Sequence, residues 1–206
     1  MSRTGRPREF DRVKAVQNAV RVFWERGYES TTLLELQEVM GGISAPSFYN
    51  AFGSKENLFR EAVAVYAEQE GSGVPKVLSE EKTARAAIES MFREIIKLVA
   101  SSENPKGCMI ALGGINCSEA NSEITHFLQE LRRQRAATLR SRLERGISDG
   151  DLPNGFDAAG FAGFIDTVVD GLCLQAKDGA SPETLGRIVE FAMAGWDSAI
   201  ESASAR

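Results

Sequence analysis

The one histidine of the chain, His126, follows Glu123 with the spacing that di-iron helical bundles use. Such a centre needs a second Glu-x-x-His pair, and the chain has no second histidine to supply it. The same shortage leaves no base for a serine or cysteine nucleophile, and no glycine-rich phosphate-binding loop occurs. We therefore expect no catalytic residues, no metal site and no cofactor. His126 is expected as a surface or half-buried histidine, with a pocket histidine or metal ligand as the alternative.

Three cysteines could carry redox chemistry: Cys108, Cys117 and Cys173. They are too few and too irregularly spaced for a disulfide framework, which favours a reducing cytoplasm. Cys108 and Cys117 are nine residues apart and are expected to face different directions. A buried, inert thiol is the expectation for each. The alternative is a redox sensor, which requires a thiolate stabilised by nearby positive charge.

Six arginines lie between residues 132 and 145. Glu130 and Glu144 lie within a helical turn of some of them, so the simplest interpretation is a solvated face with ion pairs. The alternative is a site for an acidic or phosphate-bearing effector.

The elements that would position a binding surface are clearest in residues 31–58. This stretch reads as two short helices joined by a turn, followed by the start of a third helix. Thr32 and Glu35 form a capping box at the start of the first helix. Gly41–Gly42 tolerates positive φ where that helix must end, and Ser44 can cap the next helix. The pattern predicts a helix-turn-helix, with an ordinary helical hairpin inside a larger bundle as the alternative.

The second helix of this pair has two different faces. Phe48 and Phe52 share an inward face, whereas the outward face is small, hydrogen-bonding and aromatic, which suits the major groove of DNA. Lys55 and Thr32 lie at helix N-termini, where phosphates bind. The residues expected to contact DNA are Thr32, Ser44, Ala45, Pro46, Ser47, Tyr49, Asn50 and Lys55, together with Arg3 and Arg6 of the N-terminal tail.

These residues carry a family resemblance. The stretch FDRVKAVQNAVRVFWERGYESTT, followed by SFYNAFGSKENLF, resembles the N-terminal domain of the tetracycline-repressor (TetR) family of bacterial transcription regulators. The match covers about residues 8–66, and its most specific parts are Phe23 to Thr32 and Ser47 to Glu56. Met40-Gly41-Gly42-Ile43 is one residue longer than the family's usual turn, so the recognition helix is expected to be slightly re-aimed.

The charge distribution agrees with a basic DNA-reading part on an acidic body. The net charge of −5 divides into +2 for residues 1–60 and −7 for residues 61–206. The basic excess is modest, which predicts a specific binder with few phosphate contacts. No apolar run approaches a membrane span, and no secretory signal follows the first ten residues, so we expect a cytoplasmic protein without a membrane partner.

The rest of the chain keeps helical spacing, and the fold class is expected to be all-α. We expect a helix-turn-helix DNA-binding domain over residues 1–53, a connecting helix over 54–70 and a helical bundle for ligand binding and dimerisation over 71–206. Residues 71–82 are expected as a loop, and 108–117 as a short apolar helix. Long helices are expected over residues 121–148, 158–177 and 182–202.

The resemblance implies a homodimer formed through the last two helices and a small-molecule effector in the bundle. The candidate dimer anchors are Phe161, Val168, Leu172, Ile188, Phe191 and Trp196, although all of these side chains could instead be intramolecular core. The candidate pocket residues are Met91, Phe92, Ile95, Met109, Leu112, Phe127, Phe164 and Val168, which could equally pack solid.

The sequence thus predicts a homodimeric TetR-like transcriptional regulator. Such proteins are usually repressors, released from a palindromic or near-palindromic double-stranded operator by a small molecule. Two alternatives remain: a regulator gated by thiol oxidation, and a helical enzyme or carrier with an incidental helix-turn-helix.

Overall fold

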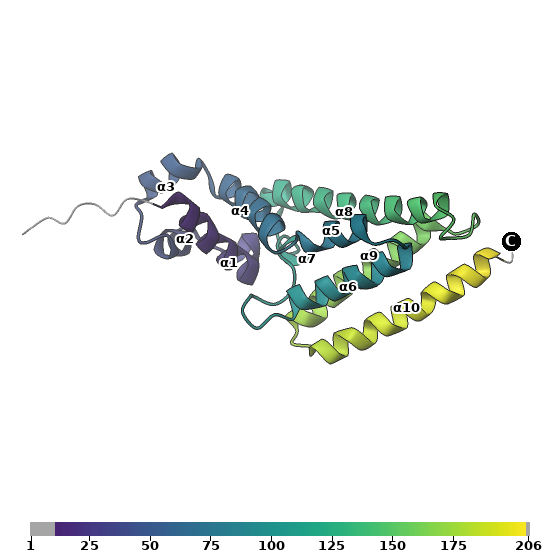
Figure 1. Ribbon diagram of the computed structural model, residues 1–206. Coiled ribbons are helices and arrows are strands. Elements are labelled where there is room, and N and C mark those ends of the chain that lie inside the picture. The colour runs from purple at the N-terminus through teal and green to yellow at the C-terminus, as the bar shows by residue number, and fades with distance from the viewer. Residues whose placement is uncertain (1–10, 205–206) are drawn as a thin grey trace, which may run out of the picture.

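The computed structural model describes residues 11–204, and no strand occurs among them. The predicted all-α fold is confirmed: a small N-terminal head sits at one end of a long helical bundle (Figure 1). The helices are α1 (Arg12–Ser30), α2 (Leu33–Val39), α3 (Ala45–Phe52), α4 (Lys55–Gln69), α5 (Gly73–Glu80), α6 (Ala84–Val99), α7 (Met109–Leu112), the 3-10 turn η1 (Glu119–Asn121), α8 (Ser122–Ser148), α9 (Ala158–Lys177) and α10 (Pro182–Ser204).

The head consists of α1–α4 around an aromatic core. The Phe59 ring of α4 makes edge-on contacts with two rings of α1, Phe23 at a centroid distance of 5.0 Å and Tyr28 at 5.1 Å. All three side chains are buried. Edge-to-face pairs of this kind add to the free energy of burial, so they fix α4 against α1.

The head core also contains side chains from later in the chain. Met109 of α7 and Leu128 of α8 have no exposed surface, Ile124 of α8 has 1%, and all three belong to the same buried cluster as Phe23 and Phe59. These three side chains therefore pack as part of the head, although the sequence places them in the second half of the chain.

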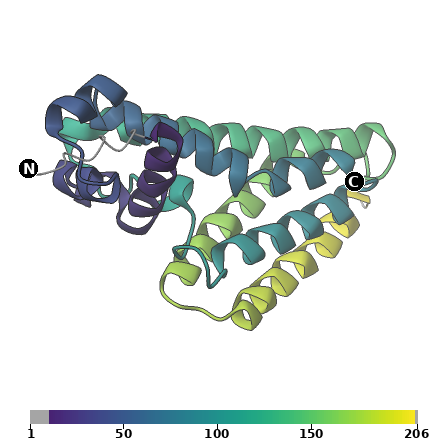
Figure 2. The ribbon, with the colours of Figure 1, turned by 60° about the vertical axis from the view of Figure 1, so that its left-hand side comes forward.

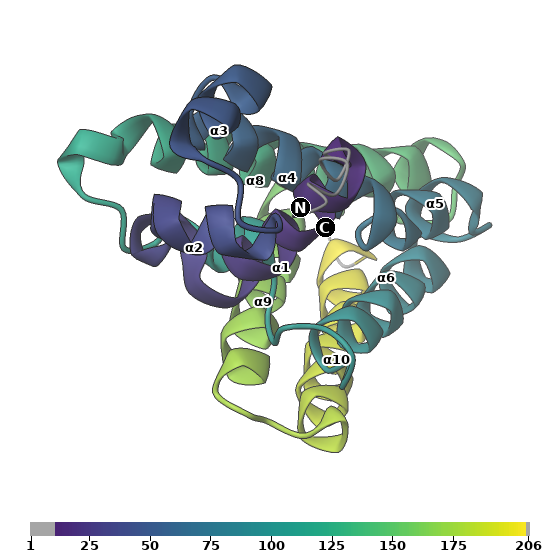
Figure 3. The same cartoon turned by 90° about the vertical axis from the view of Figure 1, so that its left-hand side faces the viewer.

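The bundle is formed by α5, α6, α8, α9 and α10. Figures 1 and 2 show α8 along one side and α10 along the other, and Figure 3 shows α6, α9 and α10 extending behind the head. The buried cluster of the bundle includes Ile88, Leu143, Ile165 and Trp196, each with at most 1% of its surface exposed. The predicted helices over 121–148, 158–177 and 182–202 are confirmed to within two residues.

Two expectations for local structure were wrong. Residues 71–82 were expected as a loop, but Gly73–Glu80 forms α5. Val74, Val77 and Leu78 share one face that packs against the bundle core, and the glycine and proline lie in the first turn, where a helix tolerates them. The short helix expected over 108–117 spans only Met109–Leu112. The Gly113 amide makes the last helical bond, to the carbonyl of Met109 at 2.9 Å, and the amides of Ile115 and Cys117 bond three residues back instead of four.

Gly27 interrupts α1 one turn before its end. Its φ of 75° and ψ of 175° belong to a region that only glycine occupies readily. The next residue, Tyr28, donates its amide to the carbonyl of Gly113 at 2.9 Å, and a Cβ on Gly27 would lie 3.1 Å from that carbonyl oxygen. The break therefore allows α1 to dock against the chain that follows α7.

We expect Gly27→Ala to lower the free energy of unfolding by about 1–3 kcal/mol, because alanine is strained at this φ and ψ. Gly41→Ala is the matched control, since Gly41 also has positive φ but an added Cβ there would meet nothing within 4 Å. Urea unfolding followed by circular dichroism measures both. Equal losses for the two variants would show that the close approach to Gly113 adds nothing to the cost.

Candidate nucleic-acid interface and effector cavity

The capping box predicted at the start of α2 is confirmed. The Thr32 amide donates to the Glu35 carboxylate at 2.8 Å, and the Glu35 amide donates to the Thr32 hydroxyl at 3.2 Å. Arg26 of α1 forms an ion pair with the same carboxylate. Thr32 therefore lies exposed at the N-terminus of α2, but its hydroxyl is engaged in holding that helix end.

The turn between α2 and α3 accommodates its two glycines without strain. Gly41 and Gly42 have φ of 88° and 77°, and the Gly42 amide bonds to the carbonyl of Gln37 at 2.9 Å. The Gln37 side chain donates to the carbonyl of Ile43 at 3.0 Å, and Asn18 of α1 donates to that of Val39 at 2.6 Å. These two bonds fix the turn to α2 and α1, so α3 leaves it in a defined direction.

The outward face of α3 is exposed, as the sequence indicates. Ser44 caps the helix by accepting the Ser47 amide at 3.3 Å, and Phe48 and Phe52 point into the head core. Tyr49 is 52% exposed. The other members of the predicted DNA-contacting set on this helix lie beside it: Pro46, Ser47 and Asn50 are exposed, and Ala45 is half-buried.

The Lys55 side chain is more buried than that of a lysine that only contacts DNA phosphates. Its ammonium lies 4.2 Å from the centroid of the Tyr28 ring, and burial lowers its pKa while the nearby Glu29 carboxylate opposes that shift. Arg3 and Arg6 lie outside the described residues.

Three groups of hydrogen bonds join the head to the segment 107–121. The Trp24 indole donates to the carbonyl of Gly107 at 2.9 Å, and the Tyr28 amide donates to that of Gly113. The Glu29 carboxylate accepts from the side-chain amide of Asn121 at 2.8 Å and from the backbone amide and hydroxyl of Ser118 at 3.1 and 2.9 Å. These bonds lower the pKa of Glu29, and the one from Asn121 has the largest effect. The sequence offers one signal for this junction, since a buried tryptophan N–H needs an acceptor.

A cavity of about 340 Å³ lies where α4, α5, α6, α8 and α9 meet. Its wall is mainly apolar and contains a few polar groups. The apolar lining comes from Val74, Pro75, Leu78, Ile95, Leu98, Val99, Ile110, Leu131 and Val169, and the polar or sulfur-bearing lining from Tyr66, Cys108, Gln134, Arg135, Thr138 and Cys173.

Of the eight pocket residues expected from the sequence, Ile95 lines this cavity. Met91 and Phe92 are completely buried in the bundle core, and Met109 in the head core. The other four lie elsewhere: Phe127 is covered by the Arg60 guanidinium, Phe164 is 42% exposed on α9, and Leu112 and Val168 pack at the edge of the bundle core. Helical spacing identified apolar faces, but it does not say which of them close tightly.

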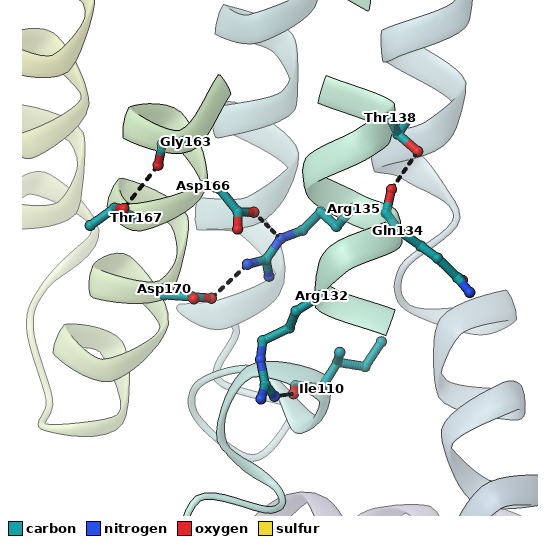
Figure 4. Close-up of polar contacts among 9 residues, drawn as sticks. All are labelled: Ile110, Arg132, Gln134, Arg135, Thr138, Gly163, Asp166, Thr167 and Asp170. Atoms are coloured by element: carbon teal, nitrogen blue, oxygen red, sulfur yellow. Dashed lines mark hydrogen bonds and ion pairs between the residues drawn. The ribbon is translucent and has the colours of Figure 1, made fainter. Parts of the chain in front are cut away.

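The arginine-rich part of α8 is only partly a solvated face. Arg140 pairs with Glu144 at 2.7 Å, as expected. Arg135 instead crosses to α9, where it bonds to Asp166 at 2.6 Å and Asp170 at 2.7 Å, and Arg132 donates to the carbonyl of Ile110 (Figure 4). Burial opposes the charged form of Arg135, but the two carboxylates raise its pKa.

Two of the expected dimer anchors are intramolecular core: Leu172 has no exposed surface and Trp196 has 1%. Phe191 is 73% exposed on α10. The remaining anchors, Phe161, Val168 and Ile188, are half-buried.

By length and composition alone, α9 is long and apolar enough to cross a membrane, and 39% of that stretch is buried inside the structure.

The remaining candidates for chemistry do not gather into a site. His126 is exposed, and Cys117 is half-buried against the head core. Among residues 11–204, no three His, Cys, Asp or Glu side chains are placed to hold a metal ion.

The geometry of α1–α4 is that of a helix-turn-helix regulator, and comparison with known proteins identifies the family. Residues 16–62 match the family model for bacterial regulatory proteins of the tetR family, and residues 84–192 match the tetracyclin repressor-like C-terminal domain. The transcriptional repressor ComR of Escherichia coli K12 is 30% identical over 193 residues, which cover 93% of this chain and 91% of ComR.

A second curated relative is the repressor BdcR of Escherichia coli K12, 25% identical over 88% of this chain and 86% of its own. A cysteine mutant of the TetR family regulator CifR, solved with 26-base-pair double-strand operator DNA, is 41% identical. The two structures superpose with a TM-score of 0.88, and the match covers 93% of this chain and 100% of the CifR chain. The chain belongs to the TetR family of transcriptional regulators.

We expect Asn50→Ala to cost about 1–3 kcal/mol of discrimination at one operator base pair, because an amide can read a base edge in the major groove. Lys55→Ala should weaken all sequences similarly and reduce the salt slope by about one. Fluorescence anisotropy with operator and scrambled duplexes over a salt series measures both effects. Asn57→Ala, an exposed asparagine on α4, is the control. The assignment of α3 as the recognition helix fails if Asn50→Ala and Lys55→Ala bind as the parent does at every salt concentration.

Proposed function

We propose that the protein is a cytoplasmic repressor that binds a palindromic or near-palindromic operator as a homodimer and has no enzymatic role. The observation that carries this proposal is the exposed face of Ser47, Tyr49 and Asn50 on α3, backed by buried Phe48 and Phe52. A face of hydrogen-bonding side chains on a fixed helix suits readout of base edges. The relative CifR was solved in complex with double-strand operator DNA, which supports operator binding by this chain.

A dimer is needed because one short recognition helix reads only a few base pairs. We propose that the faces of α9 and α10 that carry Phe164 and Phe191 form an isologous interface. Both rings are exposed in the single chain, and a Cβ added at Gly163 would meet nothing within 4 Å. An exposed apolar face with room for close helix approach favours burial against a second copy.

The cavity supports an effector-controlled switch. A ligand there changes operator affinity only if it binds the operator-incompetent arrangement of the two heads more tightly than the competent one. Tyr66 lines the cavity from α4, and Cys108 lines it from the segment that is hydrogen-bonded to the head. We propose that both elements transmit the state of the cavity to α3.

Selection of genomic DNA fragments with the purified protein tests the proposed function. We expect enrichment of a short sequence with two-fold symmetry, with half-sites about one helical turn (roughly 34 Å) apart, because the two heads of a dimer must face the same side of the duplex. Transcription from the selected promoter should fall when the protein is added. No enriched sequence, or one without symmetry, would contradict the proposal.

For the interface, we expect Phe191→Glu to give monomers, because a carboxylate buried there would have no partner. The side chain is exposed in the single chain, so the fold should be retained. Ile115→Glu, at a position that is 63% exposed outside α9 and α10, is the matched control. Sedimentation velocity distinguishes the outcomes. A dimeric, folded Phe191→Glu protein would place the interface elsewhere.

A further inference from the structure

Three reactive groups from separate parts of the chain meet on the cavity wall. Tyr66 comes from α4, Cys108 from the residue before α7 and Cys173 from α9. The Tyr66 hydroxyl donates to the sulfur of Cys108 at 3.3 Å, and the thiol of Cys173 hydrogen-bonds to the same sulfur. Cys108 keeps part of its surface accessible, whereas Cys173 is buried. Both cysteines line the cavity, and Cys108 is the one whose sulfur accepts the hydrogen bonds.

These hydrogen bonds favour the thiolate of Cys108. Donation from Cys173 lowers the pKa of the Cys108 thiol; burial opposes that shift, and the Tyr66 hydroxyl and the amides of Ile110 and Ala111 reinforce it. The hydrogen bond that Cys173 makes to Cys108, together with burial, raises the pKa of Cys173. Burial above all raises the pKa of Tyr66. Both partners therefore stay protonated as donors. A thiolate is the nucleophilic form of cysteine.

The rest of the cavity sets the character of a ligand. The only charged side chain among its lining residues is Arg135, and Asp166 and Asp170 hold that guanidinium on the α9 side (Figure 4). The other lining is mainly apolar. An uncharged apolar molecule fits such a wall better than an ion does. The nucleophilic sulfur adds the further requirement that the molecule react with a thiolate.

We propose that the effector is a small, uncharged α,β-unsaturated carbonyl compound and that Cys108 captures it by conjugate addition; this inference rests on the proposed function. The sulfur forms a bond to the β-carbon, and the π electron pair of the alkene moves toward the carbonyl oxygen. The α-carbon then takes up a proton, which balances the proton that the thiol lost. The net result is addition of S–H across the double bond, so no oxidant or reductant is consumed. The Tyr66 hydroxyl is placed to position the thiolate.

The same cysteine lies beside the contacts with the head. The carbonyl of its neighbour Gly107 accepts a hydrogen bond from the Trp24 indole, and the carbonyl of Gly113, the residue after α7, accepts one from the Tyr28 amide. A group bonded to Cys108 is carried by the segment that makes these contacts, and it acts on the head where it displaces that segment. Displacement of the segment moves the surface against which α1 is held.

The test uses the full-length protein, 2-cyclohexenone as the probe and cyclohexanone as its unreactive analogue. We expect one adduct per chain, mapped to Cys108 by peptide mass spectrometry. Operator affinity should fall by about tenfold or more with the enone and remain unchanged with the ketone. Cys108→Ser should abolish both the adduct and the release, and Cys117→Ser should abolish neither. Tyr66→Phe should shift the pH midpoint of the alkylation rate upward, an effect that lost packing alone would not produce.

The inference is overturned by an adduct elsewhere or none, by release in the Cys108→Ser protein, or by equal release with the ketone. It is also overturned if only peroxide releases the operator, with a Cys108–Cys173 disulfide as the product. Because alkylation is measured without DNA, its failure is distinct from failure to bind an operator, which would instead contradict the proposed function. Circular dichroism and Cys108→Ala provide the folding check for the serine variant.

Discussion

The structure depends on a core that the head shares with the chain following α6. Met109 and Leu128 are completely buried among the aromatic rings of α1 and α4. Removing either side chain from that core would open a cavity in the head, which costs several kcal/mol for large apolar residues. The head therefore cannot change its position while residues 107–128 stay where they are. This packing constraint makes the head and the bundle one mechanical unit.

The constraint gives the cavity an influence on DNA binding that it would lack between independent domains. Cys108 and Ile110 line the cavity, and Met109, between them, packs in the head core. Three consecutive residues thus face both regions. The hydrogen bonds that Trp24 and Tyr28 donate and that Glu29 accepts fix the orientation of this contact, since they hold both ends of the segment against α1. A change at the cavity wall has a short path to α3 through α1 and α2.

The sequence predicted the helix-turn-helix almost residue by residue because its signals are local. Capping hydroxyls, a glycine pair and two phenylalanines four residues apart act within one or two turns. The cavity could not be predicted in the same way, since Cys108 and Cys173 meet only after α7 and α9 have packed. α5 was missed because Gly73 and Pro75 resemble a loop, although its apolar face closes one wall of that cavity. The N-terminal arginines of the predicted DNA contact lie outside the described residues.

Hydrogen exchange of the dimer with and without operator DNA tests the shared core most directly, because linkage between sites is reciprocal. If head and cavity are one unit, operator binding must change the exchange of amides in residues 107–114, which are remote from α3 in sequence. We expect slower exchange there and no change in residues 149–157, which join α8 to α9 at the far end of the bundle. Protection confined to α1–α4, with residues 107–114 unchanged, would contradict the account.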